Sequence, residues 1–446
     1  MITIGDLKRM QEALDGALSG GVFLRKALSG MLGQKRYSIE ERAWIRDMLY
    51  QCVQLKNRYW TLIKEFEEKH PGQESHEQDI RLFILAHYLE RESHSAIDEE
   101  VFRELRPKSR PRKFLEFMKA GRVESLFPSP RTHFKEYLWL YHSHPLWMIR
   151  KWLGNFSAEE TRQLCEFNNS LSEVTLRINP LQGSRDELLE QLRAQGHGGR
   201  ATEESPFGIR LGRRFDPLTH PGFKTGRFSL QSLSSHLVCL YQNPKPNMRV
   251  LDYCAGEGGK TLLLAHLMGN RGEIYANDNQ VWRLRNLQLR ARNEGVGNIR
   301  LSGLRTIRKL EGQFDQVLLD VPCSGSGNFR QQPELKWKLT PEQVTELQTI
   351  QVQLLAEATP FVKPGGHVFY VTCSLFGEEN HKVVRRFIYD HPEWKVVPPA
   401  DYLRAHHQKG YWVQAEALAR YTDASYFQVQ PARHEMSGMF CAILTR

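Results

Sequence analysis

Two cysteines each follow a short apolar run, and this pairing constrains the fold more than any other feature of the chain. Cys323 stands shortly after the run 317–320, and Cys373 directly follows the run 367–372. Both runs are typical of parallel strands that are buried on both faces. Because the carboxyl ends of such strands meet at the ligand-binding edge of an open α/β sheet, the sequence predicts that both thiols lie in one site.

Few chemistries use two cysteines at such an edge. A disulfide oxidoreductase more often carries the pattern Cys-x-x-Cys, and a structural zinc site needs four ligands at short spacings. Neither pattern occurs near Cys323 or Cys373, so the sequence predicts no metal site.

A third segment is typical of a site for an adenosine cofactor. Residues 249–253 are predicted to form a strand, 254–259 a tight turn and 260–268 the opening of a helix. The glycines of the turn permit positive φ, and the helix amino terminus offers unpaired N–H groups to an anion. Asp278 follows the next predicted strand, 273–277, at a place where a carboxylate accepts hydrogen bonds from a ribose.

Three sequence runs carry a resemblance to a known family. They are Asp252-Tyr253-Cys254-Ala255-Gly256-Glu257-Gly258-Gly259-Lys260-Thr261, then Asp320-Val321-Pro322-Cys323-Ser324-Gly325-Ser326-Gly327 with Arg330, Pro333, Lys336 and Trp337, and finally Thr372-Cys373-Ser374-Leu375 with Glu379-Asn380. These runs resemble the S-adenosylmethionine-dependent RNA cytosine-5 methyltransferases of the Sun/Fmu (RsmB-like) family. The helical amino-terminal part is similar to the NusB-like domain of the bacterial 16S ribosomal RNA members, so the resemblance covers nearly the whole chain.

The resemblance implies a multidomain chain, in agreement with its 446 residues. Residues 1–138 are expected to form an all-α NusB-like domain that binds RNA, and residues 139–225 a small α+β module that recognises RNA. Residues 226–446 are expected to form a Rossmann-like α/β domain of the class I methyltransferases. The implied cofactor is S-adenosylmethionine, and the implied partner is RNA, above all 16S ribosomal RNA of the small subunit.

The resemblance also implies a division of labour between the two cysteines. C5 of cytosine is a poor nucleophile, and attack by a thiolate at C6 makes that carbon reactive. By the family's pattern Cys373 is this nucleophile, and Cys323 assists release after the C5 proton has left. Asp320 is expected to hydrogen-bond the N3 and exocyclic amine edge of the base, and Lys260 is one source of positive potential for a thiolate. The alternatives are an inert buried thiol for Cys373 and a turn-capping role for Asp320.

Cofactor and RNA contacts follow from the same motifs. By resemblance, the residues expected to bind the cofactor are Cys254, Ala255, Gly256, Glu257, Gly258, Gly259, Lys260, Asp278 and Asp320. The segment after the first catalytic cysteine is expected to grip the flipped nucleotide or neighbouring phosphates through Arg330, Lys336 and Trp337. Core or turn packing is the favoured role for Cys254, and a packing role for Trp337 stays open.

Two departures from the family's pattern concern the cofactor. Glu257 stands where the family usually has proline, and we expect its side chain to point to solvent. The pair Gly303-Leu304 replaces a Gly-Asp pair whose acid reaches the adenine edge. The missing acid keeps a second function open, namely a non-catalytic RNA-binding or ribosome-assembly factor on a degenerate methyltransferase scaffold.

The charge balance agrees with a polyanionic partner. The chain has 61 Lys and Arg against 51 Asp and Glu, a net charge of +10, with local excesses in 103–113 and 281–310. In the first stretch, Pro107 and Pro111 predict that no helix forms. The residues of this stretch expected to contact RNA are Arg106, Lys108, Arg110 and Arg112. A merely solvated surface is the alternative interpretation of both stretches.

The remaining expectations concern compartment and core. The seven widely spaced cysteines predict that the protein resides in a reducing cytoplasm. No apolar run approaches the length that spans a bilayer. We expect a cytoplasmic, soluble monomer. Cys52 lies on a helical apolar stripe that begins after a capping box at Ser38, and Cys441 lies in a terminal strand, 439–444, so both are predicted to be core residues.

Overall fold

The chain folds as two units in a computed structural model that describes residues 2–19, 21–33, 37–71, 79–91, 94–105, 108–120, 123–407 and 412–446. One unit comprises Met1–Ser172 and Asn328–Leu339, and the other comprises Glu173–Gly327 and Thr340–Arg446. Residues 139–172 and 328–339 both belong to the first unit, and residues 173–225 belong to the second.

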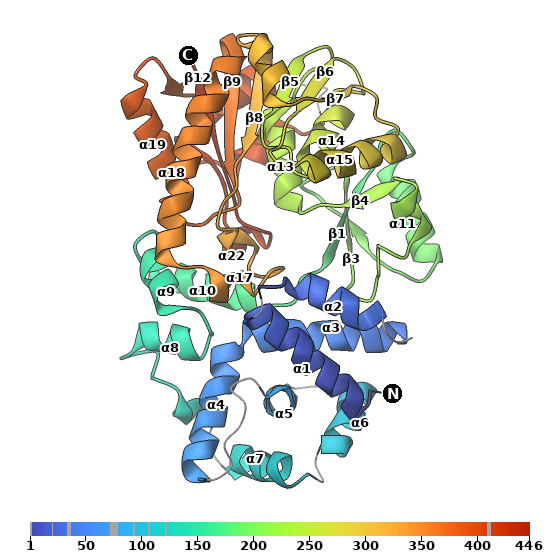
Figure 1. The fold of residues 1–446 in the computed structure, drawn as a ribbon, viewed down its shortest axis with the longest axis vertical. Helices are drawn as coiled ribbons and strands as arrows, with labels where there is room; N and C mark the ends of the chain where they lie inside the picture. Colours follow the sequence, from blue (N-terminus) through green and yellow to red (C-terminus); the bar gives the residue numbers. More distant parts are fainter. Residues whose placement is uncertain are drawn as a thin grey trace. The chain divides into compact units, whose positions relative to one another are not determined.

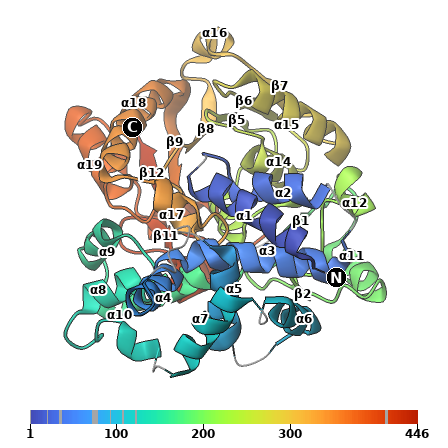
Figure 2. The same ribbon diagram turned by 60° about the horizontal axis from the view of Figure 1, so that its bottom comes forward.

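The first unit is helical. Its helices are α1 (Ile4–Leu18), α2 (Leu24–Gly33), α3 (Ile39–Gln54), α4 (Lys56–Lys69), α5 (Ile80–Glu90), α6 (Ala96–Leu105), α7 (Ser109–Ala120), α8 (Phe134–Leu140), α9 (Leu146–Leu153), α10 (Ala158–Asn169) and α17 (Leu335–Lys338). Helix α1 packs beside α2, α3 and α5 around one apolar core (Figure 2). The predicted capping box is present at Ser38, and Cys52 is a buried core residue as predicted.

The prediction that no helix forms in the basic stretch 103–113 is wrong. Helix α7 begins at Ser109 and contains Pro111 in its first turn. A proline costs little there, because the N–H groups of the first turn have no partner inside the helix. The N–H of Arg112 already bonds the Lys108 carbonyl oxygen at 3.0 Å. The predicted contact residue Arg106 lies outside the described residues.

The second unit contains two sheets with their helices. Its strands are β1 (Val174–Ile178), β2 (Arg200–Ala201), β3 (Gly208–Leu211), β4 (Phe228–Leu230), β5 (Arg249–Asp252), β6 (Glu273–Ala276), β7 (Ile299–Leu301), β8 (Phe314–Asp320), β9 (Val362–Thr372), β10 (Lys395–Val396), β11 (Phe427–Val429) and β12 (Met439–Thr445). Its helices are α11 (Arg185–Ala194), α12 (Pro221–Lys224), α13 (Leu233–Gln242), α14 (Gly259–Leu267), α15 (Val281–Glu294), α16 (Leu304–Ile307), α18 (Pro341–Ala358), α19 (His381–Asp390), α20 (Pro399–His406), α21 (Ala415–Ala419) and α22 (Pro431–His434). The small sheet is antiparallel with the order β2-β3-β1-β4.

The large sheet has the order β10-β12-β9-β8-β5-β6-β7, and β11 pairs with β12. Strands β9, β8, β5, β6 and β7 are parallel, whereas β12 runs antiparallel to β9. Helices α13, α14 and α15 cover one face, and α18 and α19 cover the other (Figure 1). Alternate residues of β9 therefore enter opposite cores, with Phe369 and Val371 on one side and Val368 and Tyr370 on the other.

This topology creates the predicted edge. Strand β5 lies between β8 and β6, so the order reverses beside β5, and ligands of open α/β sheets bind outside the carboxyl ends at such a point. Asp252, Asp320 and Thr372 end the three neighbouring strands β5, β8 and β9. The predicted helical amino-terminal region and the predicted α/β domain are confirmed. Within the described part of the chain, no helix is both long and apolar enough to cross a membrane.

Candidate functional site

The two predicted thiols lie side by side. Strands β8 and β9 are parallel neighbours, and the turns after them bring the Sγ atoms of Cys323 and Cys373 to 3.1 Å from each other. The N–H of Cys373 also donates to Cys323 Sγ at 3.3 Å. The hydrogen bond with Cys373, together with burial, raises the pKa of the Cys323 thiol. The geometric prediction from the sequence is therefore confirmed, and Cys323 is held in its protonated form in the resting protein.

A lysine and an aspartate pair at the same edge. Lys260, at the start of α14, donates from Nζ to Asp320 Oδ2 at 2.5 Å. Burial disfavours the charge of Lys260, but the carboxylate of Asp320 outweighs burial and raises the pKa of Lys260. The charged ammonium group of Lys260 therefore lies beside Asp320 at the end of β8. The ion pair uses Asp320 Oδ2 and leaves Oδ1 out.

The glycine turn has the backbone that a close-fitting cofactor loop needs. Gly256 has a φ of 55° and Gly258 a φ of 80°. A Cβ at Gly258 would also lie 2.1 Å from Leu287 Cδ1, so no other residue fits beneath α15 there. Helix α14 begins directly after the turn and presents its first N–H groups toward the carboxyl edge of the sheet. Cys254, which was also expected to bind the cofactor, is half-buried in this turn, and burial raises the pKa of its thiol.

Asp278 connects the turn to the next strand. Its Oδ2 accepts from the N–H of Gly256 at 2.9 Å, and its Oδ1 accepts from the N–H of Gln280 at 2.8 Å. The carboxylate keeps lone pairs for further donors, because each oxygen accepts more than one hydrogen bond. Glu257 is exposed, as expected from the sequence, and Leu304, which replaces the family's acid, begins α16 with a half-exposed side chain.

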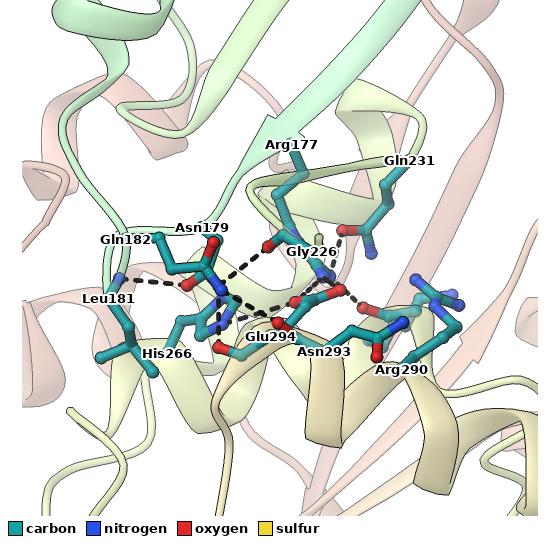
Figure 3. A network of polar contacts seen from close by, with 12 residues as sticks. Arg177, Asn179, Leu181, Gln182, Gly226, Gln231, His266, Arg290, Asn293 and Glu294 are labelled. Atoms are coloured by element: carbon teal, nitrogen blue, oxygen red, sulfur yellow. Dashed lines mark hydrogen bonds and ion pairs between the residues drawn. The ribbon is translucent and has the colours of Figure 1, made fainter. Parts of the chain in front are cut away.

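A buried ion pair supports the turn from below, and the sequence did not reveal it. Arg177 of β1 and Glu294 of α15 have side chains that are 0% and 3% exposed, and Arg177 Nη2 donates to Glu294 Oε2 at 2.7 Å (Figure 3). Arg177 Nη1 donates to the carbonyl oxygen of Gly259 at 2.6 Å and to Gln231 Oε1 at 3.0 Å. The small sheet thus holds the first residue of α14, next to Lys260. An arginine inside the apolar strand 174–178 was the signal that could have indicated this role.

Three residues expected to grip RNA lie in the helical unit. Lys336 is 1% exposed, and its Nζ donates to the carbonyl oxygen of Gln54 at 2.6 Å and to Asn169 Oδ1 at 3.1 Å. Burial lowers the pKa of Lys336 well below its usual range. The Trp337 indole donates to the Val53 carbonyl oxygen at 2.7 Å, in line with the packing alternative.

Arg330 is the third of these residues. Its Nη2 donates to the Leu171 carbonyl oxygen at 2.6 Å, and its guanidinium lies over the Phe167 ring, 4.6 Å from the centroid. All three residues therefore have partners within the helical unit. Their contact with RNA stays a prediction.

The described residues of the basic stretch differ in exposure. Arg110 forms an ion pair with Glu67 at 2.8 Å, whereas Lys108 is exposed and Arg112 is 63% exposed near Glu116. Lys108 and Arg112 have charged groups available to a polyanion. Among the described residues, no cluster of three His, Cys, Asp or Glu side chains is placed to hold a metal ion.

Two protein-family models match the sequence. The description "16S rRNA methyltransferase RsmB/F" matches residues 239–445, and the ferredoxin-like domain of RsmF/B-like methyltransferases matches residues 144–216. The solved protein PH0851 resembles the chain with a TM-score of 0.75 and 25% identity over 99% of both chains. A methyltransferase homologue from Pyrococcus horikoshii gives a TM-score of 0.56 and 28% identity over 71% of this chain and 99% of its own. NSun6 from the same organism, solved with SFG, shares the fold with a TM-score of 0.55 at 20% identity, covering 67% of this chain and 97% of its own.

Curated relatives carry a consistent name. The probable ribosomal RNA small subunit methyltransferase B of Synechocystis is 33% identical over 68% of this chain and 67% of its own length. The protein of the same name from Bacillus subtilis is 32% identical over 57% of each chain. The match to the B. subtilis relative therefore spans little more than half of that protein. With the Synechocystis relative, the matching family description and the observed fold, the chain belongs to the RsmB/F family of 16S ribosomal RNA methyltransferases.

Proposed function

We propose that this protein transfers a methyl group from S-adenosylmethionine to C5 of a cytosine in small-subunit ribosomal RNA. Family membership supports methylation of ribosomal RNA with this cofactor. The observation that carries the cytosine-5 assignment is the pair of thiols 3.1 Å apart at the ends of two neighbouring strands. A covalent attack on the base followed by release is a chemistry that uses two such thiols.

The residues at the edge fit the cofactor. The turn 254–259 and Lys260 offer backbone N–H groups and a close approach, Asp278 offers carboxylate lone pairs to a ribose, and Asp320 closes the opposite side. When bound, S-adenosylmethionine supplies an electrophilic methyl group on a sulfonium. The missing acid at Gly303-Leu304 leaves more of the binding to Asp278.

In the proposed mechanism Cys373 attacks C6 of the cytosine. The S–C6 bond forms, the C5=C6 electron pair shifts to the C4–C5 bond, and the C4=N3 pair moves onto N3, so that C5 becomes an enamine carbon able to accept a methyl group. Asp320 holds the N3 and amine edge, and its partner Lys260 stays charged throughout. After methylation the C5 proton passes to water, the electron pair of the C5–H bond re-forms the C5=C6 bond, and the S–C6 electron pair leaves with the sulfur of Cys373. Cys323, within hydrogen-bond distance of Cys373, assists this release.

The same proposal assigns RNA contacts outside the edge. Lys108 and Arg112 have exposed charges that suit phosphates, and Arg106 and Arg110 belong to the same basic stretch. Residues 328–339, which hold Arg330, Lys336 and Trp337, would have to exchange some of their internal partners to reach a nucleotide.

The division of labour between the thiols can be tested with purified protein, S-adenosylmethionine and small-subunit ribosomal RNA on denaturing gels. We expect Cys323→Ala to accumulate a covalent protein–RNA species and Cys373→Ala to form neither this adduct nor 5-methylcytosine. Cys441→Ala is the matched control, since Cys441 is a buried thiol of the same sheet. An adduct in Cys373→Ala but not in Cys323→Ala reverses the two roles.

The substrate can be tested by bisulfite sequencing of ribosomal and transfer RNA with and without the gene. We expect a single cytosine of 16S ribosomal RNA to lose its methylation. If the protein binds RNA but neither binds S-adenosylmethionine nor changes any cytosine, the non-catalytic RNA-binding function replaces this proposal.

A further inference from the structure

A buried polar cluster joins the two turns that carry the thiols. The hydroxyls of Ser324, Ser326 and Ser374 lie 3.2 Å from one another, and all three side chains are buried. Ser326 Oγ also accepts from the N–H of Leu375 at 2.8 Å. Serines from the turns after β8 and β9 therefore hydrogen-bond one another at the carboxyl edge of the sheet.

Glu379 lies at the centre of this cluster and is 0% exposed. Its Oε1 accepts from the N–H of Ser324 at 2.8 Å, and its Oε2 accepts from the hydroxyl of Ser374. Ser324 directly follows Cys323, and Ser374 directly follows Cys373. One carboxylate thus holds the residue next to each thiol.

The carboxylate is itself held in place. Gln351 of α18 donates from Nε2 to Glu379 Oε1 at 3.0 Å and to the Pro322 carbonyl oxygen at 3.0 Å. The Tyr370 hydroxyl of β9 donates to the Glu379 carbonyl oxygen at 2.6 Å. The three donors to the carboxylate, an N–H, an amide and a hydroxyl, are all neutral. Among the residues that the structure describes, no Lys, Arg or His forms an ion pair with this buried carboxylate.

Such an arrangement is costly, and an apolar contact between the turns would be cheaper. We propose that Glu379 is a positioning residue for the thiol pair, whose carboxylate fixes both turns and so holds the sulfur of Cys323 within hydrogen-bond distance of the sulfur of Cys373. The charge of the same carboxylate favours the protonated form of Cys323. A protonated Cys323 stabilises a Cys373 thiolate by hydrogen bonding, which is what the nucleophile needs before it attacks. The catalytic meaning of this inference rests on the proposed function.

The groups that act on Cys323 come from each neighbouring element. The hydrogen bond with Cys373, burial, the charge of Cys373 and the charge of Glu379 all raise the pKa of Cys323, and the backbone at Gly325 lowers it. Tyr370 is a further titratable group that interacts with this thiol, and burial raises the pKa of its hydroxyl. Removal of the Glu379 charge should therefore lower the pKa of Cys323.

The charge is tested by Glu379→Gln, because an amide oxygen keeps both N–H donors of Oε1. In the protein alone, the pH profile of iodoacetamide modification is followed at Cys323 by peptide mass spectrometry. We expect the midpoint to fall by about one pH unit in Glu379→Gln. The matched control is Glu378→Gln, which removes the same charge one residue earlier, where the carboxylate pairs with Lys382, and should leave the midpoint unchanged. An unchanged midpoint in Glu379→Gln overturns the role of the charge.

The geometry is tested by Glu379→Ala. We expect cross-linking of Cys323 to Cys373 by dibromobimane, which joins adjacent thiols, to be lost in Glu379→Ala and retained in Glu379→Gln. We also expect the methylation rate of Glu379→Ala to fall about a hundredfold with unchanged S-adenosylmethionine affinity. Full cross-linking in a folded Glu379→Ala overturns the inference, and if this variant does not fold, the Glu379→Gln profile decides.

The alkylation and cross-linking measurements use neither RNA nor cofactor. If they behave as expected in a protein that methylates no RNA, the proposed function fails and the positioning of the thiols stands. If methylation occurs and the profile does not move, the inference fails alone.

Discussion

Replacement of Arg177 by methionine should destabilise the second unit strongly. The variant leaves the 3% exposed carboxylate of Glu294 without its cation, and loss of one partner of a buried pair costs about 3–5 kcal/mol. It also removes a charged donor from the Gly259 carbonyl oxygen and from Gln231, but such losses are not additive. For a unit of this size, about 3–5 kcal/mol lowers the midpoint of thermal unfolding by about 6–20 °C.

A double variant and a control variant test the predicted loss of stability. The double variant Arg177→Met/Glu294→Leu leaves no unpaired buried charge, so it should recover most of the lost stability. Arg200→Met is the matched control, because Arg200 pairs with Glu173 at 2.8 Å on the same sheet but is 61% exposed, and exposed pairs contribute about 0–1 kcal/mol. Scanning calorimetry with and without S-adenosylmethionine identifies the transition of the second unit, since the cofactor stabilises the unit that binds it.

Two results would refute this reasoning. Arg177→Met could unfold within about 1 kcal/mol of the original protein, which would mean that the pair is not desolvated as the structure has it. Alternatively, the double variant could be no more stable than the single variant, which would mean that an unpaired carboxylate is not the cause of the loss. At temperatures where Arg177→Met is folded, we also expect weaker cofactor binding, because Arg177 holds the residue that precedes Lys260.

Three further predictions concern single sites. Asp278→Ala should nearly eliminate S-adenosylmethionine binding in calorimetry, whereas Glu257→Pro should be tolerated because Glu257 is exposed; normal binding by Asp278→Ala would remove the ribose assignment. Replacing Lys108 and Arg112 by Ala should weaken RNA binding and flatten its salt dependence with no change in cofactor affinity, and an unaltered salt slope would show that the two residues are only solvated. Burial lowers the pKa of Lys336, so the unfolded chain binds a proton that the folded chain lacks, and the free energy of unfolding should rise with pH up to the usual lysine pKa of 10.5. Lys336→Met should flatten this dependence of the unfolding free energy on pH, as measured by denaturant unfolding. An equally steep dependence in the variant would place the lysine in solvent.

The edge of the sheet was predictable from the sequence because strand ends leave clear local signals. The apolar runs stop at Asp252, Asp320 and Thr372, where turn residues follow, and parallel strands of this kind have few possible arrangements. Cys52 and Cys441 are core residues for a similar reason, since each falls on an apolar periodicity. Strand ends then fix the order of the site residues in space without any knowledge of side-chain contacts.

The segment 328–339 shows where this reasoning stops. A motif gives the residue types of Lys336 and Trp337, but their partners at Gln54 and Val53 lie in α3, far earlier in the chain. No local pattern distinguishes a lysine that meets a phosphate from one that meets two carbonyl-type oxygens in a core. The helix at Ser109–Ala120 was missed for a different reason, because the cost of a proline depends on its position within the helix, and the helix start was not marked by the sequence.

The periodic spacing of apolar residues in a sequence does not show which charged residues are buried. Arg177 and Glu294 are 117 residues apart in the chain, and Ser324 and Glu379 are 55 apart, so each partner looks like a surface residue until the other is placed beside it. A buried charge that lacks partners destabilises the fold, and a satisfied one fixes two distant segments at a hydrogen-bond distance. In this chain both such carboxylates hold a turn of the candidate site, Glu294 through Arg177 at the cofactor turn and Glu379 at the thiols. The polar interior therefore sets the geometry of the carboxyl edge, and variants that keep the hydrogen bonds while removing the charge separate its two effects.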